Sequence, residues 1–412
     1  MIVWLGLGPL NLAKAAGATS PSITGPQIVR DLTNRLSSGS QVILASDPAF
    51  LTDFTQRFSA SGPPSYVVAV KPRLVTDVSQ IVRYARNNKI PILTTGGGHG
   101  YSLSLNRLSG GIDIDLSNFN AIQVNPVAGT MTIGGFVQTR NVTSALQAAG
   151  KELTVAECTC VGYAGYTLGG GIGPYAGLHG PASDSLLSAE MVTGKGEILT
   201  VSSEHHPDLF YGLKGAGFNY GIATSLTYRV HPATNGGQAV VTNMIIPASL
   251  NGTIWKTVAR FFNMKPSQPK ELTIDLIVSY DQARGLLFIL SFVYAGPEAA
   301  STALLKPFLD LNPLNLEIIP TSWEDINKFI QYGIAFEAGC GRNLQFISYP
   351  VNLYKVDVPH LIDIVNYMSD SIAKTAELGS VLFSWAQFSS YGFSKHPDRS
   401  SAFPYRDPTV FV

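Results

Sequence analysis

The pattern of apolar and polar positions near the start of the chain alternates between strand and helix. Residues 66–70 are mostly β-branched and apolar, which predicts a strand. Apolar residues then recur at helical spacing through 78–85, after Thr76 as the predicted N-cap, and residues 91–95 predict a second strand. A strand, a helix and a strand in this order favour a parallel pair of strands.

Further elements up to about residue 232 are predicted from the same strand and helix periodicities. A helix is predicted over residues 26–36, with proline at its first position, and another over residues 142–149. The remaining apolar segments are short and predict strands, at 111–116, 122–125, 130–133, 186–192, 198–201 and 221–230.

The second half of the chain has a different pattern. Residues 272–280 and 286–294 predict two strands joined as a hairpin. Helices are predicted at 297–311, 323–332 and 358–378, and a strand at 381–388. We therefore predict an α+β protein with a leader at 1–20, one domain at 21–235 and a second domain, an antiparallel sheet with helices, at 236–412.

Composition narrows the class of protein. Of the 412 residues 45% are hydrophobic, and the 28 basic residues balance the 28 acidic ones. A nucleic-acid partner would require a basic face, and no apolar run reaches the ~18 residues of a membrane span, so we expect neither. The three cysteines are too few for a disulfide framework, and no Cys/His cluster indicates a metal site.

The location of the protein follows from weaker signals. An apolar run at residues 2–12 resembles a signal peptide without its basic start. Asn141 and Asn251 each begin a glycosylation sequon, and both should be exposed if the protein is secreted and glycosylated. Together these features predict a secreted glycoprotein, with a cytoplasmic protein as the alternative.

Two glycine-rich stretches are the main candidates for chemistry. The first, Gly96-Gly-Gly-His-Gly100 followed by Tyr101 and Ser102, comes directly after a predicted strand. Glycine permits close approach of the backbone, and successive N–H groups can bind phosphate oxygens. The second runs from Cys158 to Gly173, so one elongated dinucleotide could lie between the two. The alternative is that these glycines only permit close packing.

Four motifs in order give the chain a resemblance to a known family. They are Gly96-Gly-Gly-His-Gly100, Gly111-Ile-Asp-Ile-Asp-Leu116, the Cys158 to Gly173 stretch with Gly177-Leu-His-Gly180, and Asp208-Leu-Phe with the run from Gly215 to Ile222. They resemble the PCMH-type FAD-binding family (the vanillyl-alcohol oxidase superfamily), and within it the berberine-bridge-enzyme-like oxidoreductases. The resemblance is strong over residues 60–235 and weaker up to Ala402-Phe-Pro-Tyr-Arg406.

The resemblance implies a cofactor and roles for matching residues. FAD would be bonded to His99 through its 8α-methyl group, and Cys158 would reach flavin C6. Residues 96–102 would hold the pyrophosphate. Backbone contacts to the flavin would come from Gly162, Gly165, Gly169, Gly170, Gly171 and Ile222. The fold implied is a two-subdomain FAD-binding domain followed by a substrate domain.

The chain departs from the family pattern at two places. Cys160 lies two residues after Cys158, so in an extended chain both thiols face one side and either or neither could meet the flavin. The family's Tyr-x-Asn segment, which returns to the flavin domain, has no counterpart before Val412. The catalytic residue is therefore unassigned. Tyr391 and Tyr405 are weak candidates, and ordinary packing in the sheet is the favoured interpretation of both.

The resemblance implies an oxidoreductase. It would remove a hydride from a C–H next to oxygen or nitrogen of a sugar, an alcohol or a natural-product intermediate, with molecular oxygen as acceptor. The alternative is a truncated or catalytically weakened flavin-binding protein. An NADH-using reductase lacks a visible nicotinamide site, and the turn at Gly6 to Gly8 is not followed by the acidic strand that a Rossmann motif requires.

Overall fold

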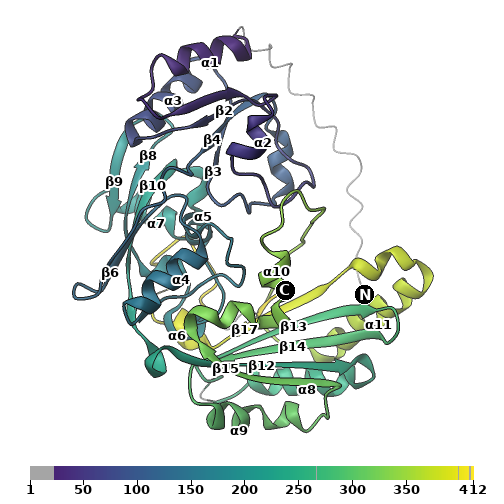
Figure 1. The fold of residues 1–412 in the computed structure, drawn as a ribbon. Coiled ribbons are helices and arrows are strands. Elements are labelled where there is room, and N and C mark those ends of the chain that lie inside the picture. Colours follow the sequence, from purple (N-terminus) through teal and green to yellow (C-terminus); the bar gives the residue numbers. More distant parts are fainter. Residues whose placement is uncertain (1–22, 266, 398, 408–409) are drawn as a thin grey trace.

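The computed structural model describes residues 23–265, 267–397, 399–407 and 410–412. The predicted leader lies outside these residues. Figure 1 shows an elongated molecule in which an N-terminal lobe, a central sheet and a third, larger sheet follow one another. The α+β class predicted from the sequence is confirmed. None of the helices among the described residues is long and apolar enough to cross a membrane.

The N-terminal lobe is a four-stranded sheet covered by helices. Its strands run in the order β1 (Gln41–Leu44), β2 (Tyr66–Lys71), β4 (Gly111–Asp115) and β3 (Ile92–Thr95). Both β2 and β3 are parallel to β4, which lies between them. The strands of the predicted β-α-β unit are thus parallel but are not neighbours. The helices are α1 (Gly25–Thr33), the short α2 (Ala49–Asp53) and α3 (Val75–Asn87).

The predicted N-cap at Thr76 is wrong by two residues. Helix α3 begins at Val75, and Leu74 is its N-cap. The Asp77 carboxylate accepts a hydrogen bond of 2.9 Å from the backbone N–H of Leu74, so an acidic side chain of the first turn satisfies the helix start.

The central sheet is antiparallel throughout. Its order is β5 (Ile122–Asn125), β6 (Thr130–Gly134), β10 (Ile222–Arg229), β8 (Leu186–Val192) and β9 (Ile198–Ser202). The helices of this region are α4 (Thr139–Ala148), α5 (Tyr163–Leu168), α6 (Ala176–His179) and α7 (Pro207–Ala216). A small ladder joins β7 (Lys151–Glu152) to β11 (His231–Pro232).

The third sheet has seven strands, all paired antiparallel. Their order is β15 (Asn315–Ser322), β12 (Gln238–Pro247), β14 (Gly285–Tyr294), β13 (Leu272–Asp281), β17 (Phe383–Phe388), β18 (Val410–Phe411) and β16 (Asn352–Leu353). The predicted hairpin is β13 with β14, and it is confirmed. Helices α8 (Asn251–Phe262), α9 (Glu298–Leu309) and α11 (Val358–Lys374) pack with it, and α10 (Ile334–Ala338) and α12 (Ser390–Phe393) are short.

The predicted helix at 323–332 is wrong. The segment forms two 3-10 turns, Trp323–Lys328 and Ile330–Gly333. Gln331 and Tyr332 have φ of 53° and 56°, which an α-helix does not allow.

Both faces of the third sheet are buried. Leu272, Ile274 and Leu276 of β13 belong to the core shared with the helices. Residues alternate along a strand, so Thr273 and Asp275 point to the opposite face. On that face Val241 and Val293 join the core of the central region. The third sheet therefore presents a mixed apolar and polar face to the part of the chain that holds the glycine-rich stretches.

Candidate functional site

The two glycine-rich stretches meet backbone to backbone. The first follows β3, and the second includes the N-cap of α5 at Gly162. A β-carbon added to Gly162 would lie only 2.6 Å from the backbone nitrogen of Gly97. Side chains larger than hydrogen do not fit at this crossing, so the sequence requires glycine here.

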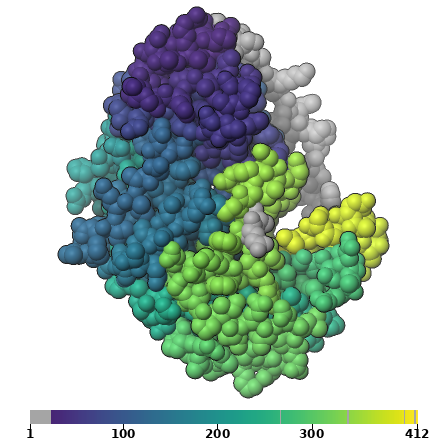
Figure 2. All heavy atoms as spheres, in the orientation of Figure 1, coloured from purple at the N-terminus to yellow at the C-terminus, as the bar shows by residue number. Residues whose placement is uncertain are grey.

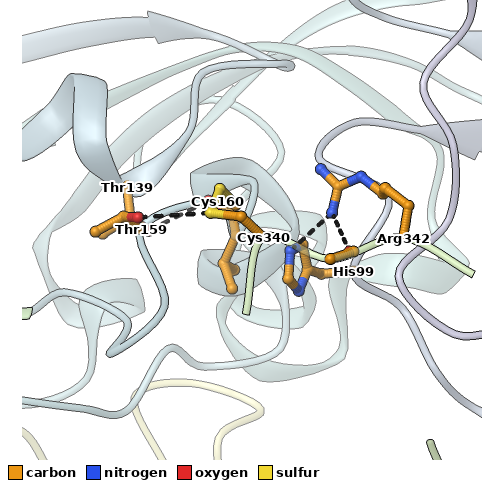
Figure 3. Close-up of a disulfide and its surroundings, with 8 residues drawn as sticks. His99, Thr139, Thr159, Cys160, Cys340 and Arg342 are labelled. Carbon is orange, nitrogen blue, oxygen red and sulfur yellow. Dashed lines mark hydrogen bonds between the residues drawn. A yellow bond between two sulfur atoms is a disulfide. The ribbon is translucent and has the colours of Figure 1, made fainter. Parts of the chain in front are cut away.

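The His99 ring is held in place beside this crossing. It stacks on Phe58, with ring centroids 4.8 Å apart and 16° between the planes. Its Nε2 accepts a hydrogen bond of 3.3 Å from Arg342 Nη1 (Figure 3). Burial, together with the Arg342 charge, lowers the pKa of His99 to about 4. The ring is therefore neutral throughout the physiological pH range.

Cys160 forms a disulfide with Cys340, 180 residues further along the chain (Figure 3). The sequence left it open whether Cys158 or Cys160 meets the flavin, and it gave no indication of a disulfide. The disulfide occupies Cys160, and Cys158 is the free cysteine of the described chain. Among the two thiols, only Cys158 is then available for a second link.

The disulfide ties a segment of the C-terminal half to the central region, and backbone hydrogen bonds tie the same segment to the N-terminal lobe. The backbone of Asn343 donates 2.8 Å to the Arg57 carbonyl, and that of Leu344 donates 2.8 Å to the Phe58 carbonyl. Ser59 and Leu344 pair as an isolated parallel bridge. Figure 1 shows this loop rising from α10 toward α2 and β3, and Figure 2 shows it lying against the lobe.

The Cys158 thiol lies under this segment. Gly339 packs directly on Cys158 Sγ. Burial raises the pKa of the Cys158 thiol, while the positive charges of Arg342 and Arg140 act in the opposite direction. Cys158 is partly exposed, so a small molecule in this region can reach it.

The remaining residues of the first stretch have different surroundings. Gly96 is partly buried and Gly98 is buried, and Gly98 has φ of 73°. Gly100 packs on Arg57, which donates to its carbonyl oxygen. Two further predicted residues lie at the surface: Tyr101 is 43% exposed, and Ser102 is the N-cap of a short 3-10 turn.

The glycines of the second stretch divide into two groups. Gly165 and Gly169 are exposed, and nothing lies within 4 Å of a β-carbon placed on Gly165. Gly170 and Gly171 are buried, and Gly170 packs on the Phe403 ring. Close packing therefore explains these two in the structure, whereas the first two remain accessible to a ligand.

Ile222 and the two candidate tyrosines have ordinary environments. Ile222 is 6% exposed and belongs to the core of the N-terminal lobe. Tyr391 is 45% exposed, with the ammonium groups of Lys270 and Lys395 over its ring. Tyr405 packs edge-on against neighbouring aromatic rings. These contacts are those of packing residues.

Sequence reasoning missed a pair of acidic residues. Asp275 on β13 is 1% exposed, and its carboxyl group faces that of Glu157, the residue before Cys158. Within the described part of the chain, no N–H or hydroxyl group donates a hydrogen bond to either oxygen of Asp275. Burial raises the pKa of both carboxyl groups, and the Glu157 charge raises that of Asp275 further.

This pair lies on a polar row across the third sheet. In the strand register Asn243 is opposite Ser291, which is opposite Asp275. Ser291 Oγ donates 2.7 Å to Asn243 Oδ1, so these two satisfy each other. The only sequence signal for Asp275 is an acidic residue within an apolar strand, Leu272–Asp281, at a position that alternation places opposite the helical core.

The residues present fit an FAD molecule. The touching backbones of the two stretches, together with the exposed Gly165, provide the close approach that a dinucleotide needs. A neutral histidine is hydrogen-bonded to Arg342, and the Arg342 charge also acts on a free thiol, Cys158. A carboxyl pair without a counter-charge lies next to the thiol. These are the kinds of group that FAD binding, covalent attachment and proton transfer would require.

Comparisons with known proteins agree with this fit. Residues 66–202 match a family model described as FAD binding domain. The chain is 38% identical over 333 residues to the FAD-linked oxidoreductase azaL of Aspergillus niger. This match covers 81% of this chain and 68% of that protein.

Two solved structures have the same fold. Chitooligosaccharide oxidase aligns with a TM-score of 0.75 at 20% identity, covering 93% of this chain and 81% of that one. A glucooligosaccharide oxidase from Acremonium strictum, whose structure is described as revealing a novel flavinylation, aligns with a TM-score of 0.75 at 18% identity, covering 95% and 81%.

Proposed function

The chain belongs to the FAD-linked oxidoreductases, and from this premise we propose that it is a berberine-bridge-enzyme-like oxidase of small molecules. FAD is its cofactor. The substrate would lose a hydride from a C–H next to oxygen or nitrogen, and molecular oxygen would accept the electrons. When bound, FAD supplies the hydride acceptor, and the protein supplies orientation and electrostatics.

The observation that carries the proposal is the neutral His99 ring beside the crossing of the two glycine stretches. A histidine must lose its ring proton to bond to the flavin 8α-carbon, and a pKa of about 4 favours the uncharged ring. We therefore propose His99 as the covalent link. Cys158 would supply a second link, since Cys160 is in a disulfide.

The Glu157–Asp275 pair is the proposed proton acceptor. Oxidation of an alcohol or amine releases a proton from oxygen or nitrogen as the hydride leaves carbon, and a positioned base accelerates this step. Burial raises the pKa of both facing carboxyl groups, so a carboxylate of the pair, once ionised, binds a proton more readily than an ordinary acidic side chain. Glu157 is partly exposed and would contact the substrate, with Asp275 behind it.

The substrate class is proposed from chemistry and from the neighbours. The structural neighbours are named as oxidases of chito- and glucooligosaccharides. Short oligosaccharides are therefore the first class to test, followed by simple alcohols and amines. The Cys160–Cys340 disulfide supports the proposal that the protein is secreted, because disulfides persist mainly in oxidising compartments.

One purified sample tests these proposals in sequence. Acid precipitation should leave the yellow colour in the pellet of the wild-type protein and release it to the supernatant in a His99→Ala, Cys158→Ser double variant. Peroxide release with cellobiose, chitobiose, benzyl alcohol and benzylamine then reports oxidase activity. A yellow protein that neither bleaches nor forms peroxide with any of them would favour a catalytically weakened flavin-binding protein.

A further inference from the structure

Arg342 contacts His99 directly and acts electrostatically on Cys158, the two residues proposed to bond to the flavin. Its Nη1 donates 3.3 Å to His99 Nε2 (Figure 3), and its charge acts on both the His99 ring and the Cys158 thiol. Neither the family motifs nor the sequence pattern indicated this residue, because it comes from the distant segment after α10.

The position of Arg342 is fixed from both sides. Two residues before it, Cys340 is bonded to Cys160. Immediately after it, the backbones of Asn343 and Leu344 each donate 2.8 Å to carbonyls of the N-terminal lobe. The guanidinium group is therefore held at the glycine crossing by a covalent bond and a short ladder.

A guanidinium group in this position has a definite electrostatic effect. It donates hydrogen bonds and cannot accept them, so Nε2 of His99 must be unprotonated while this contact is present. A second positive charge on the imidazole would lie next to a permanent one, which opposes protonation of the ring. The stacking on Phe58 fixes the plane of the ring, and Arg342 fixes its rotation within that plane.

We propose that Arg342 is a positioning residue for covalent flavin attachment, holding His99 uncharged and correctly oriented before the bond forms. The proposal rests on His99 as the attachment site. In this reaction a ring nitrogen of His99 bonds to the 8α-carbon. The ring N–H proton and one methyl hydrogen are transferred, with two electrons, to the flavin, which is reduced. Molecular oxygen then accepts the two electrons and two protons to give hydrogen peroxide.

The role of Arg342 predicts a pH-dependent defect. In Arg342→Gln the ring loses its orienting contact at every pH and also gains protons more readily, although burial still opposes protonation. Its attachment to the flavin should therefore slow about fivefold at pH 5 and about twofold at pH 8, where the ring is neutral in any case and only the orientation is lost. Arg342→Lys keeps the positive charge and should restore most of the rate at pH 5. Arg86→Gln removes an exposed arginine on α3 and is the matched control for net charge.

The readout is attachment itself and not turnover. Each full-length protein, made in riboflavin-starved cells, is mixed with FAD in air. Samples are precipitated with acid over time, and the flavin in pellet and supernatant is measured by absorbance. All variants are made in a Cys158→Ser background, so that only the histidine link is counted.

The outcomes separate failure of attachment at His99 from failure of the role proposed for Arg342. No flavin in the pellet of the parent protein overturns attachment at His99 and, with it, the role of Arg342. Equal rates for the parent and Arg342→Gln at both pH values overturn the role of Arg342 alone.

An equal slowing at pH 5 and pH 8 that Arg342→Lys does not restore assigns Arg342 a purely structural role and also overturns the proposal. If Arg342→Gln does not fold, a Cys160→Ser, Cys340→Ser double variant replaces it, since it frees the segment, leaves no new thiol and keeps the guanidinium group. The same acid-selective slowing is expected, and a rate equal to that of the parent counts against the proposal.

Discussion

Two buried aspartates join the FAD-binding half to the C-terminal half in opposite ways. Asp184 accepts hydrogen bonds from both terminal nitrogens of Arg406, one of them at 2.8 Å, and Arg406 Nη2 also donates 2.6 Å to Ser401 Oγ. Asp275 is equally buried but faces a second carboxyl group, Glu157. The Asp184–Arg406 pair is therefore compensated in charge, and the Glu157–Asp275 pair is uncompensated.

The contrast separates structural from chemical uses of burial. A buried carboxylate is stable when a paired cation and further donors replace its water, as Arg406 does for Asp184. A carboxyl group without such donors keeps its proton instead, and its titration becomes available for chemistry near neutral pH. The uncompensated pair includes the residue before Cys158, whereas the compensated pair includes Arg406 of the 402–406 segment, which packs on Gly170 and Gly215.

The largest expected effect comes from breaking the compensated pair. Arg406→Ala leaves Asp184 buried and unpaired, so we expect a loss of about 3–5 kcal/mol in the free energy of unfolding. Urea denaturation followed by tryptophan fluorescence measures this loss. Lys306→Ala, which removes an exposed ion pair with Asp310, should leave the midpoint unchanged. Equal midpoints for the two variants would contradict the contrast.

Removal of the disulfide should have the next largest effect. The bond closes a long loop between the two halves of the chain, so Cys340→Ser should destabilise the protein by about 2–4 kcal/mol. Cys158→Ser is the matched control, since it removes the free thiol and should change stability little. Both are compared by denaturation without reductant. A larger effect of Cys158→Ser would show that the pairing is different.

The uncompensated pair predicts a gain in stability. A folded-state pKa of Asp275 above its unfolded value means that the folded protein binds more protons than the unfolded chain above about pH 4. The free energy of unfolding therefore falls as the pH rises toward the raised value. Asp275→Asn removes this proton exchange, so its Tm at pH 8 should exceed that of the parent by about 3 °C.

Scanning calorimetry from pH 5 to pH 8 tests this sign. The difference between Asp275→Asn and the parent should grow with pH. Asp310→Asn, at an exposed carboxylate on the surface, serves as the control and should give a curve parallel to the parent. A variant that is less stable than the parent at pH 8 would mean that Asp275 is compensated after all.

The same contrast explains what the sequence could predict. Strands 122–125 and 186–192 were predicted with the bounds observed, because their apolar patterns reflect which side chains the fold buries. Strand β12 was missed, because Thr242 and Asn243 interrupt its apolar pattern, and Asn243 lies on the face that meets the FAD-binding half. Polar residues that face a site weaken the pattern from which strands are recognised.

The residues of the candidate site also fall into two groups, those that a local sequence pattern marks and those that it does not. The glycine crossing and His99 were predicted because local motifs mark them. Arg342, Cys340 and Asp275 come from distant parts of the chain and are brought there by tertiary structure, for which no local pattern exists. The Cys160–Cys340 pairing follows from the loop after α10 reaching the N-terminal lobe, which periodicity does not predict.

The smallest expected effect concerns the two sequons, which also differ in burial. Asn141 is exposed on α4, as predicted, although its side-chain oxygen accepts a hydrogen bond of 3.2 Å from the Gln138 backbone. The expectation that Asn251 is exposed is wrong: it is 6% exposed and donates 3.1 Å to the Ile362 carbonyl. An N-linked glycan is bulky and must lie on the surface.

Secreted from a eukaryotic host, the protein should therefore have one glycan, which endoglycosidase removes in a single mobility shift. Asn141→Gln should abolish the shift without changing stability, and Asn251→Gln should keep it. A shift that survives in Asn141→Gln and disappears in Asn251→Gln would place Asn251 at the surface and contradict the packing of α8 against α11.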